Sequence, residues 1–151
     1  MSTYESIAAF LKHEGELLGT TEWQAIDQSR INAFADVTGD HQWIHVDERR
    51  ALVESPFGKT VAHGALTLSL CSAFLSELIH VDGVRLVVNG GLNKVRFRTP
   101  VLVGSRVRGV ATLTQARPLS NGARVVVQVK VEIEGETKPA CIADQVLVFY
   151  E

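Results

Sequence analysis

The stretch HGALTLSLCSAFLSELI, residues 63–79, constrains the fold of this 151-residue chain more than any other segment. Read as a helix it is apolar nearly all the way round, and such a helix is normally surrounded by other protein. Ser69, Ser72, Ser76 and Glu77 interrupt the apolar run, which is also shorter than the ~20 residues that span a bilayer. We therefore expect a core helix and not a membrane anchor, and another layer of the chain must wrap it.

The second half of the chain supplies the wrapping layer. Apolar residues alternate there with mostly polar ones, which is typical of a strand buried on one side: Val125, Val127, Val129, Val131 and Ile133. Asn121-Gly122 predicts a hairpin before this strand, because both residue types tolerate positive φ. Residues 86–88 and 142–150 are apolar on both sides and need cover on both faces. The pattern predicts an α+β domain in which an antiparallel sheet packs on one buried helix.

The segments before the core helix are shorter. A short helix within residues 6–18 and a short strand over residues 21–26 are predicted from spacing. A second helix is expected after Asp27 or Ser29, either of which can cap its start, and Gly39 is suited to end it.

Size and composition favour one ordinary domain, spanning residues 1–151. A hydrophobic content of 46% and a net charge of −2 provide no excess of positive charge for holding nucleic acid or an anionic membrane. The first residues lack a secretory signal pattern, which favours the cytoplasm. Cys71 and Cys141 lack the clustered spacing of zinc sites, and we expect two buried thiols.

Three residues are the leading candidates for chemistry. Asp40 and His45 lie five residues apart, and a carboxylate and an imidazole placed together can share one water molecule. Gly64 opens the core helix, where a bare backbone N–H can meet developing negative charge. This combination suggests the addition or removal of water next to a carbonyl group.

Three longer segments carry a resemblance to a known family. They are FADVTGDHQWIH (residues 34–45), FGKTVAHG (residues 57–64) and LNKVRFRTPVLVGS (residues 92–105). In this order they resemble the MaoC-like, (R)-specific enoyl-CoA hydratase family, across nearly the whole chain. Family members commonly have Asn-Pro where this chain has Gln42-Trp43, and the change resembles a branch grouped with nodulation proteins.

The resemblance implies a hot-dog fold, with a long antiparallel sheet around a central helix and two subunits that join their sheets as a homodimer. It implies that Asp40 and His45 act on water at the β-carbon of a trans-2-enoyl-CoA thioester, giving (R)-3-hydroxyacyl-CoA without a metal or redox cofactor. Gly64 would donate its N–H to the thioester oxygen. Gln42 would supply an amide that holds the pair or the substrate. His63 would either point towards the site or hydrogen-bond nearby backbone.

Other readings of these residues stay open at this point. An acyl-thioesterase on the same fold would use a carboxylate to direct water at the carbonyl carbon, and a non-catalytic protein would only bind an acyl thioester. A metal site at His41, His45 and Asp47 lacks an open ligand set at helical spacing. Lys94, Arg96 and Arg98 alternate with apolar residues along one predicted strand. These basic side chains either bind the phosphates of coenzyme A or form a solvated strand face.

Overall fold

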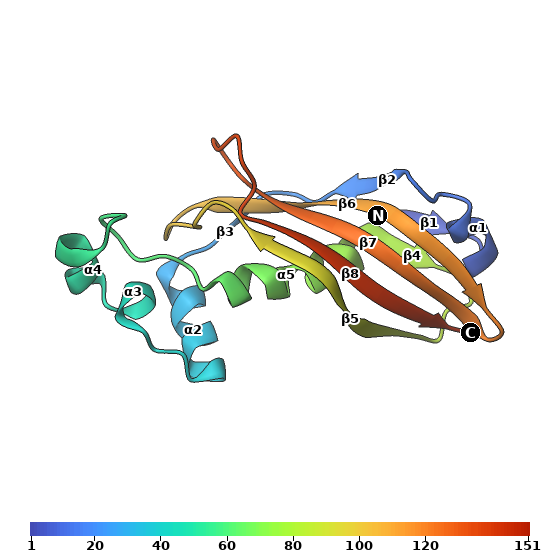
Figure 1. The fold of residues 1–151 in the computed structure, drawn as a ribbon, viewed down its shortest axis with the longest axis horizontal. Coiled ribbons are helices and arrows are strands. Elements are labelled where there is room, and N and C mark those ends of the chain that lie inside the picture. The colour runs from blue at the N-terminus through green and yellow to red at the C-terminus, as the bar shows by residue number, and fades with distance from the viewer.

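The computed structural model describes all 151 residues. A curved antiparallel sheet lies along one side of helix α5 (Gly64–Leu78), as Figure 1 shows. Its strands run in the order β2 (Leu17–Thr20), β6 (Arg106–Leu119), β7 (Gly122–Ile133), β8 (Cys141–Tyr150) and β5 (Leu86–Phe97), and β3 (Gln24–Ala25) also pairs with β6. The expected α+β hot-dog arrangement is confirmed. No helix is both long and apolar enough to cross a membrane.

The remaining elements lie at the two ends of the sheet. Helix α1 (Ile7–Leu11) and a two-stranded parallel pair, β1 (Ser2–Tyr4) with β4 (Ile79–Val81), lie at one end. At the other end, α2 (Gln28–Thr38), α3 (Trp43–Val46) and α4 (Glu48–Glu54) project beyond the strands beside the start of α5 (Figure 1).

The core forms where alternate strand residues meet α5. The five residues of β7 predicted to face inwards are all buried, as are Val107 and Leu113 of β6. A Cβ atom at Gly109 would lie 2.5 Å from Cδ2 of Phe74, so the missing side chain lets the Phe74 ring pack directly on β6. Cys71 and Cys141 are free and buried, and burial raises their pKa values to about 12 and about 11. Both thiols are therefore uncharged and suited to packing.

The hairpin between β6 and β7 is confirmed, although its reason differs from the predicted one. The turn consists of Ser120 and Asn121, and Asn121 does not have a positive φ. Gly122 has a φ of +153°, and a Cβ there would lie 1.8 Å from the carbonyl oxygen of Phe149. Gly122 is thus required by the close approach of β8 and by its own backbone conformation.

The sheet covers only one side of α5 within a single chain. The helix buries its large apolar side chains, including Leu70 and Phe74, and exposes a face of small residues: Ala65, Ser69, Ser72, Ala73 and Ser76. The serines that interrupt the apolar run therefore mark the open face of the helix.

Helix α2 begins and ends at the expected residues. The Asp27 side chain accepts a hydrogen bond from the Arg30 N–H at the start of α2, and Gly39 ends α2 with a φ of +81°. In contrast, the strand predicted over residues 21–26 is reduced to the two residues of β3, and the helix predicted within residues 6–18 is only α1. Leu17 and Leu18 belong instead to β2, where pairing with β6 outweighs helical spacing.

Candidate active site

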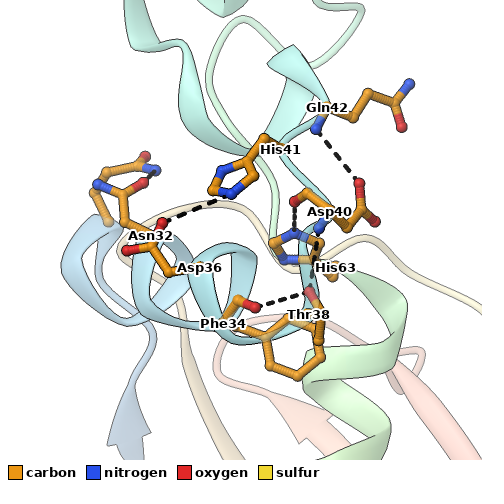
Figure 2. Close-up of polar contacts among 9 residues, drawn as sticks. Asn32, Phe34, Asp36, Thr38, Asp40, His41, Gln42 and His63 are labelled. Atoms are coloured by element: carbon orange, nitrogen blue, oxygen red, sulfur yellow. Dashed lines mark hydrogen bonds and ion pairs between the residues drawn. The ribbon is translucent and has the colours of Figure 1, made fainter.

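Asp40 lies in the turn between α2 and α3, and the backbone around it orients its carboxylate. Its N–H donates to Oγ1 of Thr38, and its Oδ1 accepts a 3.4 Å hydrogen bond from the N–H of Gln42 (Figure 2). The residue itself is exposed. The carboxylate is therefore held from one side and open to a water molecule on the other.

His45 lies on α3 and is only 7% exposed. Its Nδ1 lies 2.7 Å from the carbonyl oxygen of Val61. A carbonyl oxygen can only accept, so Nδ1 carries the hydrogen and a neutral ring keeps its lone pair on Nε2. Burial lowers the pKa of His45, the Val61 carbonyl opposes that shift, and nearby His63 lowers the pKa further. His45 is therefore a neutral imidazole with a free acceptor nitrogen near pH 7.

His63 connects the two candidate catalytic residues. Its Nε2 donates to the backbone carbonyl of Asp40 at 2.9 Å, and its ring stacks on the ring of His45 with centroids 3.8 Å apart. Phe34 of α2 also packs against the His63 ring, with 5.0 Å between the ring centroids. His63 thus orients both the Asp40 turn and the His45 ring, and its buried Nδ1 has no partner within the protein.

Two residues that the sequence reasoning missed anchor α3. Gln28 donates from Nε2 to the His45 carbonyl at 2.7 Å, and its Oε1 accepts from the hydroxyl of buried Thr60. The N–H of Val61 then donates to the carbonyl of Ile44 at 3.0 Å. No local signal marks Gln28 or Thr60, because a glutamine in the first turn of a helix and a threonine in an apolar stretch are both ordinary.

Gly64 is the first residue of α5, and its N–H makes no hydrogen bond within the protein. It lines a cavity of about 420 Å³ together with Phe97 and Arg98. A Cβ at Gly64 would lie 3.2 Å from Cε1 of Phe97, so a side chain here would crowd that ring. The free N–H and the positive end of the helix dipole are therefore both available to an oxygen that gains negative charge.

Gln42 and Trp43, the departures from the common motif, lie at the edge of the site. The Gln42 side chain is exposed and points away from the Asp40 carboxylate in Figure 2, so its observed contact is through the backbone N–H. The Arg50 guanidinium of α4 stacks over the Trp43 ring at 4.3 Å. This stack ties α3 to α4 in place of the rigid turn that proline would provide.

The side chains of Asp40, His45 and His63 offer polar atoms that all lie within 4.8 Å of one another, close enough to hold a cation. One nitrogen of each imidazole is already bonded to a backbone carbonyl, at Val61 and at Asp40. His41, the other residue weighed for a metal site, faces Asp36 at 3.7 Å (Figure 2). The arrangement of a carboxylate beside a neutral imidazole and a helix N-terminus is suited to acid–base chemistry on a water molecule.

The three basic residues Lys94, Arg96 and Arg98 do not line the same hollow. Lys94 and Arg96 line a hollow with Lys130 and Asp144, on the sheet face that is turned away from α5. Arg98, which follows the end of β5, instead lines the cavity at Gly64. Of the three, only Arg98 therefore lies near Gly64.

Known proteins resemble this chain in sequence and in fold. A family model described as a MaoC like domain matches residues 10–135. The chain is 48% identical to 3-hydroxyacyl-thioester dehydratase Z of Mycobacterium tuberculosis over 148 residues, 97% of each chain. It is 46% identical to Nodulation protein N of Rhizobium leguminosarum bv. viciae, over 95% of this chain and 90% of that one. An unliganded R-hydratase from Pseudomonas aeruginosa has the same fold, with a TM-score of 0.79 and 22% identity over 98% of this chain and 87% of its own.

Proposed function

Because the chain belongs to the MaoC-like dehydratase family, we propose that it is an (R)-specific enoyl-CoA hydratase. It reversibly adds water to a trans-2-enoyl-CoA to give an (R)-3-hydroxyacyl-CoA, acting in the cytoplasm without a metal or redox cofactor. The observation that carries this proposal is the buried, neutral His45 beside the Asp40 carboxylate, with a free helix N-terminus following His63. The 48% identity to 3-hydroxyacyl-thioester dehydratase Z supports the same reaction class.

The proposed mechanism assigns one task to each residue. Nε2 of His45 accepts a proton from the water as its oxygen attacks the β-carbon, while the Asp40 carboxylate orients that water. Electrons move towards the thioester oxygen, which the Gly64 N–H and the dipole of α5 stabilise. A proton then reaches the α-carbon from the Asp40–His45 pair, which acts as one coupled unit. His63 is a positioning residue that holds the Asp40 turn and the His45 ring.

The proposed function is tested by incubating the pure protein with crotonyl-CoA while following enoyl absorbance and free thiol together. A hydratase removes the enoyl absorbance without releasing thiol. Thiol release would identify the thioesterase alternative. Binding of acyl-CoA without either signal would identify a non-catalytic binder, and both of these results would refute the hydratase.

Activity is expected to fall as the pH is lowered through the pKa of His45. The base must be neutral to accept a proton, and the pKa of His45 is shifted below the ordinary value of about 6.5, first by burial and also by His63. The acid limb of kcat/KM should therefore have its midpoint below pH 6.5. A profile of initial rates against pH measures this midpoint, and a midpoint above 6.5 would contradict the assignment of His45 as the base.

The free edge of β5 is the proposed site of homodimer formation. β5 is the last strand of the sheet and pairs only with β8, so one row of its backbone N–H and C=O groups has no strand partner. Its apolar side chains are between 40% and 52% exposed at Leu86, Val87, Val88 and Leu92. A second copy paired along this edge would join two sheets and cover these side chains.

The dimer is tested by mass in solution. We expect light scattering to give twice the chain mass of 16.5 kDa, and Val87→Lys to shift the protein towards the monomer. Val53→Lys is the matched control, because Val53 is an exposed valine on α4, away from the β5 edge. A monomeric wild-type protein, or equal effects of the two substitutions, would refute pairing through β5.

A further inference from the structure

Gln145 is a polar residue in a row of core-facing positions on β8. Its neighbours on the same face are buried and mainly apolar: Cys141, Ala143, Leu147 and Phe149. Gln145 is only 3% exposed, and its Nε2 donates to Oγ of Ser72 on α5 at 2.9 Å. Its Oε1 has no hydrogen-bond partner. A buried amide with an unused acceptor requires an explanation, since nearly all such groups are satisfied.

The Gln145 side chain lines a hollow on the open face of α5. This hollow, of about 270 Å³, lies between α5 and β5 and includes Ala65, Ser69, Ser72 and Asn89. Ser72 and Asn89 also border the next hollow, of about 250 Å³, which is mostly apolar and reaches Phe149. At the opposite end, Ala65 adjoins Gly64, which lines the cavity of about 420 Å³ beside Phe97 and Arg98. The three hollows follow one another along α5, the helix that runs beside β5 in Figure 1.

Given the proposed function, the position of these hollows beside Gly64 indicates that they hold the acyl chain of the thioester. A thioester whose oxygen binds the N–H of Gly64 can lay its acyl chain along the open face of α5. Ser72 is eight residues further along the helix, a rise of about 12 Å. An acyl chain would therefore pass the Gln145–Ser72 pair before it reaches the apolar hollow. The pair lies in the middle of this path, in a hollow that Ser69 and Asn89 also line, and before the mostly apolar hollow at Phe149.

The hydrogen-bonding capacity of the pair matches a hydroxyl group. The Ser69 and Ser76 hydroxyls donate to the carbonyls of Leu66 and Ser72, whereas the Ser72 hydroxyl accepts from Gln145 and donates to no protein group. A ligand hydroxyl can donate to the unpaired Oε1 of Gln145 and accept from the Ser72 hydroxyl. It fits equally well if the amide is turned, because a hydroxyl is both donor and acceptor.

We propose that Gln145 and Ser72 form a specificity subsite for acyl chains that carry a hydroxyl group distant from the thioester. This inference deepens the proposed function and rests on it. A fully apolar chain would leave the Gln145 oxygen unpaired in the complex, whereas a chain with a hydroxyl at the matching position would satisfy it.

The test compares wild-type protein with Gln145→Leu on pairs of trans-2-enoyl-CoAs of increasing length, each with and without a terminal hydroxyl. For the pair whose hydroxyl reaches Gln145, we expect the substitution to lower kcat/KM for the hydroxylated chain about tenfold, the value of one good hydrogen bond. The plain chain should be unaffected or turned over faster. Gln128→Leu is the matched control, because Gln128 lies on the outer face of β7 and bonds Asp144.

The outcomes separate the subsite from the proposed function. The protein could turn over plain chains and yet show no chain length at which the hydroxyl changes the effect of Gln145→Leu on kcat/KM. That result would overturn the subsite and leave the proposed hydratase function intact. If no enoyl thioester is turned over, the hydratase fails, and calorimetric binding of saturated acyl-CoAs with and without the hydroxyl tests the subsite alone. Equal binding of the two, or a Gln145→Leu effect on the mass in solution instead of on selectivity, would also overturn it.

Discussion

Replacing His45 with Gln is expected to lower kcat on crotonyl-CoA by about 10²–10⁴-fold, the usual contribution of a positioned general base. The Gln amide can still donate to the Val61 carbonyl, which the Nδ1–H of His45 does in the wild type. It cannot accept a proton near neutral pH. The substitution therefore removes the base while it keeps the buried hydrogen bond, and the loss should appear in kcat more than in KM.

Asp40→Asn should cause a loss of similar order, because the amide keeps an oxygen for the Gln42 N–H but loses the negative charge that orients water. The two losses should not add in the double variant if the residues act as a coupled pair. His41→Gln is the control within the same turn, since His41 faces Asp36 and not the site. Wild-type rates in either single variant, with unchanged circular dichroism, would remove that residue from the mechanism.

The second large effect is expected at Gly64. Gly64→Pro removes the N–H proposed to meet the thioester oxygen, and proline is well tolerated at the first position of a helix. Losing one such donor typically costs about 10²–10³-fold in kcat, roughly 3–4 kcal/mol. The substrate should still bind, because the remaining contacts to the acyl chain are unchanged.

Gly64→Ala is the matched control for this experiment. It keeps the N–H and adds only the Cβ, which lies 3.2 Å from the Phe97 ring and shares that crowding with proline. The exposed Phe97 ring can move by a few tenths of an ångström, so we expect a loss of under tenfold for alanine. If steady-state kinetics show equal losses for proline and alanine, crowding and not the missing donor explains the effect.

Local sequence patterns predicted several elements well. Asp27 and Gly39 bound α2 as expected, since capping depends only on residues within one helical turn. The alternating valines of β7 are buried as expected, because the side-chain period of a strand is two. The predictions for residues 6–18 and 21–26 were less accurate. The end of the first segment belongs to β2 and not to a helix, and only two residues of the second form a strand that pairs with β6. Strand pairing there depends on a distant part of the chain.

The same kind of local signal pointed to part of the candidate site. Asp40, His45 and Gly64 were recognisable from a short motif and a helix start, whereas Gln28 and Thr60 carry no such signal. Gln42 was expected to use its amide, yet the structure places that side chain in solvent and uses its backbone N–H. The direction of an exposed side chain in a turn depends on the turn geometry, which the residue type alone does not specify.

Local sequence patterns were enough to identify the family, the buried helix with its sheet, and the residue types of the candidate site, because periodicity and short motifs act over a few neighbouring positions. The contacts that these residues make depend on the tertiary structure. The Val61 carbonyl that sets the tautomer of His45 is 16 residues away, and Ser72 is 73 residues from Gln145. Folding brings such groups together by packing distant segments, and burial then shifts the pKa of His45 and leaves one oxygen of Gln145 unpaired.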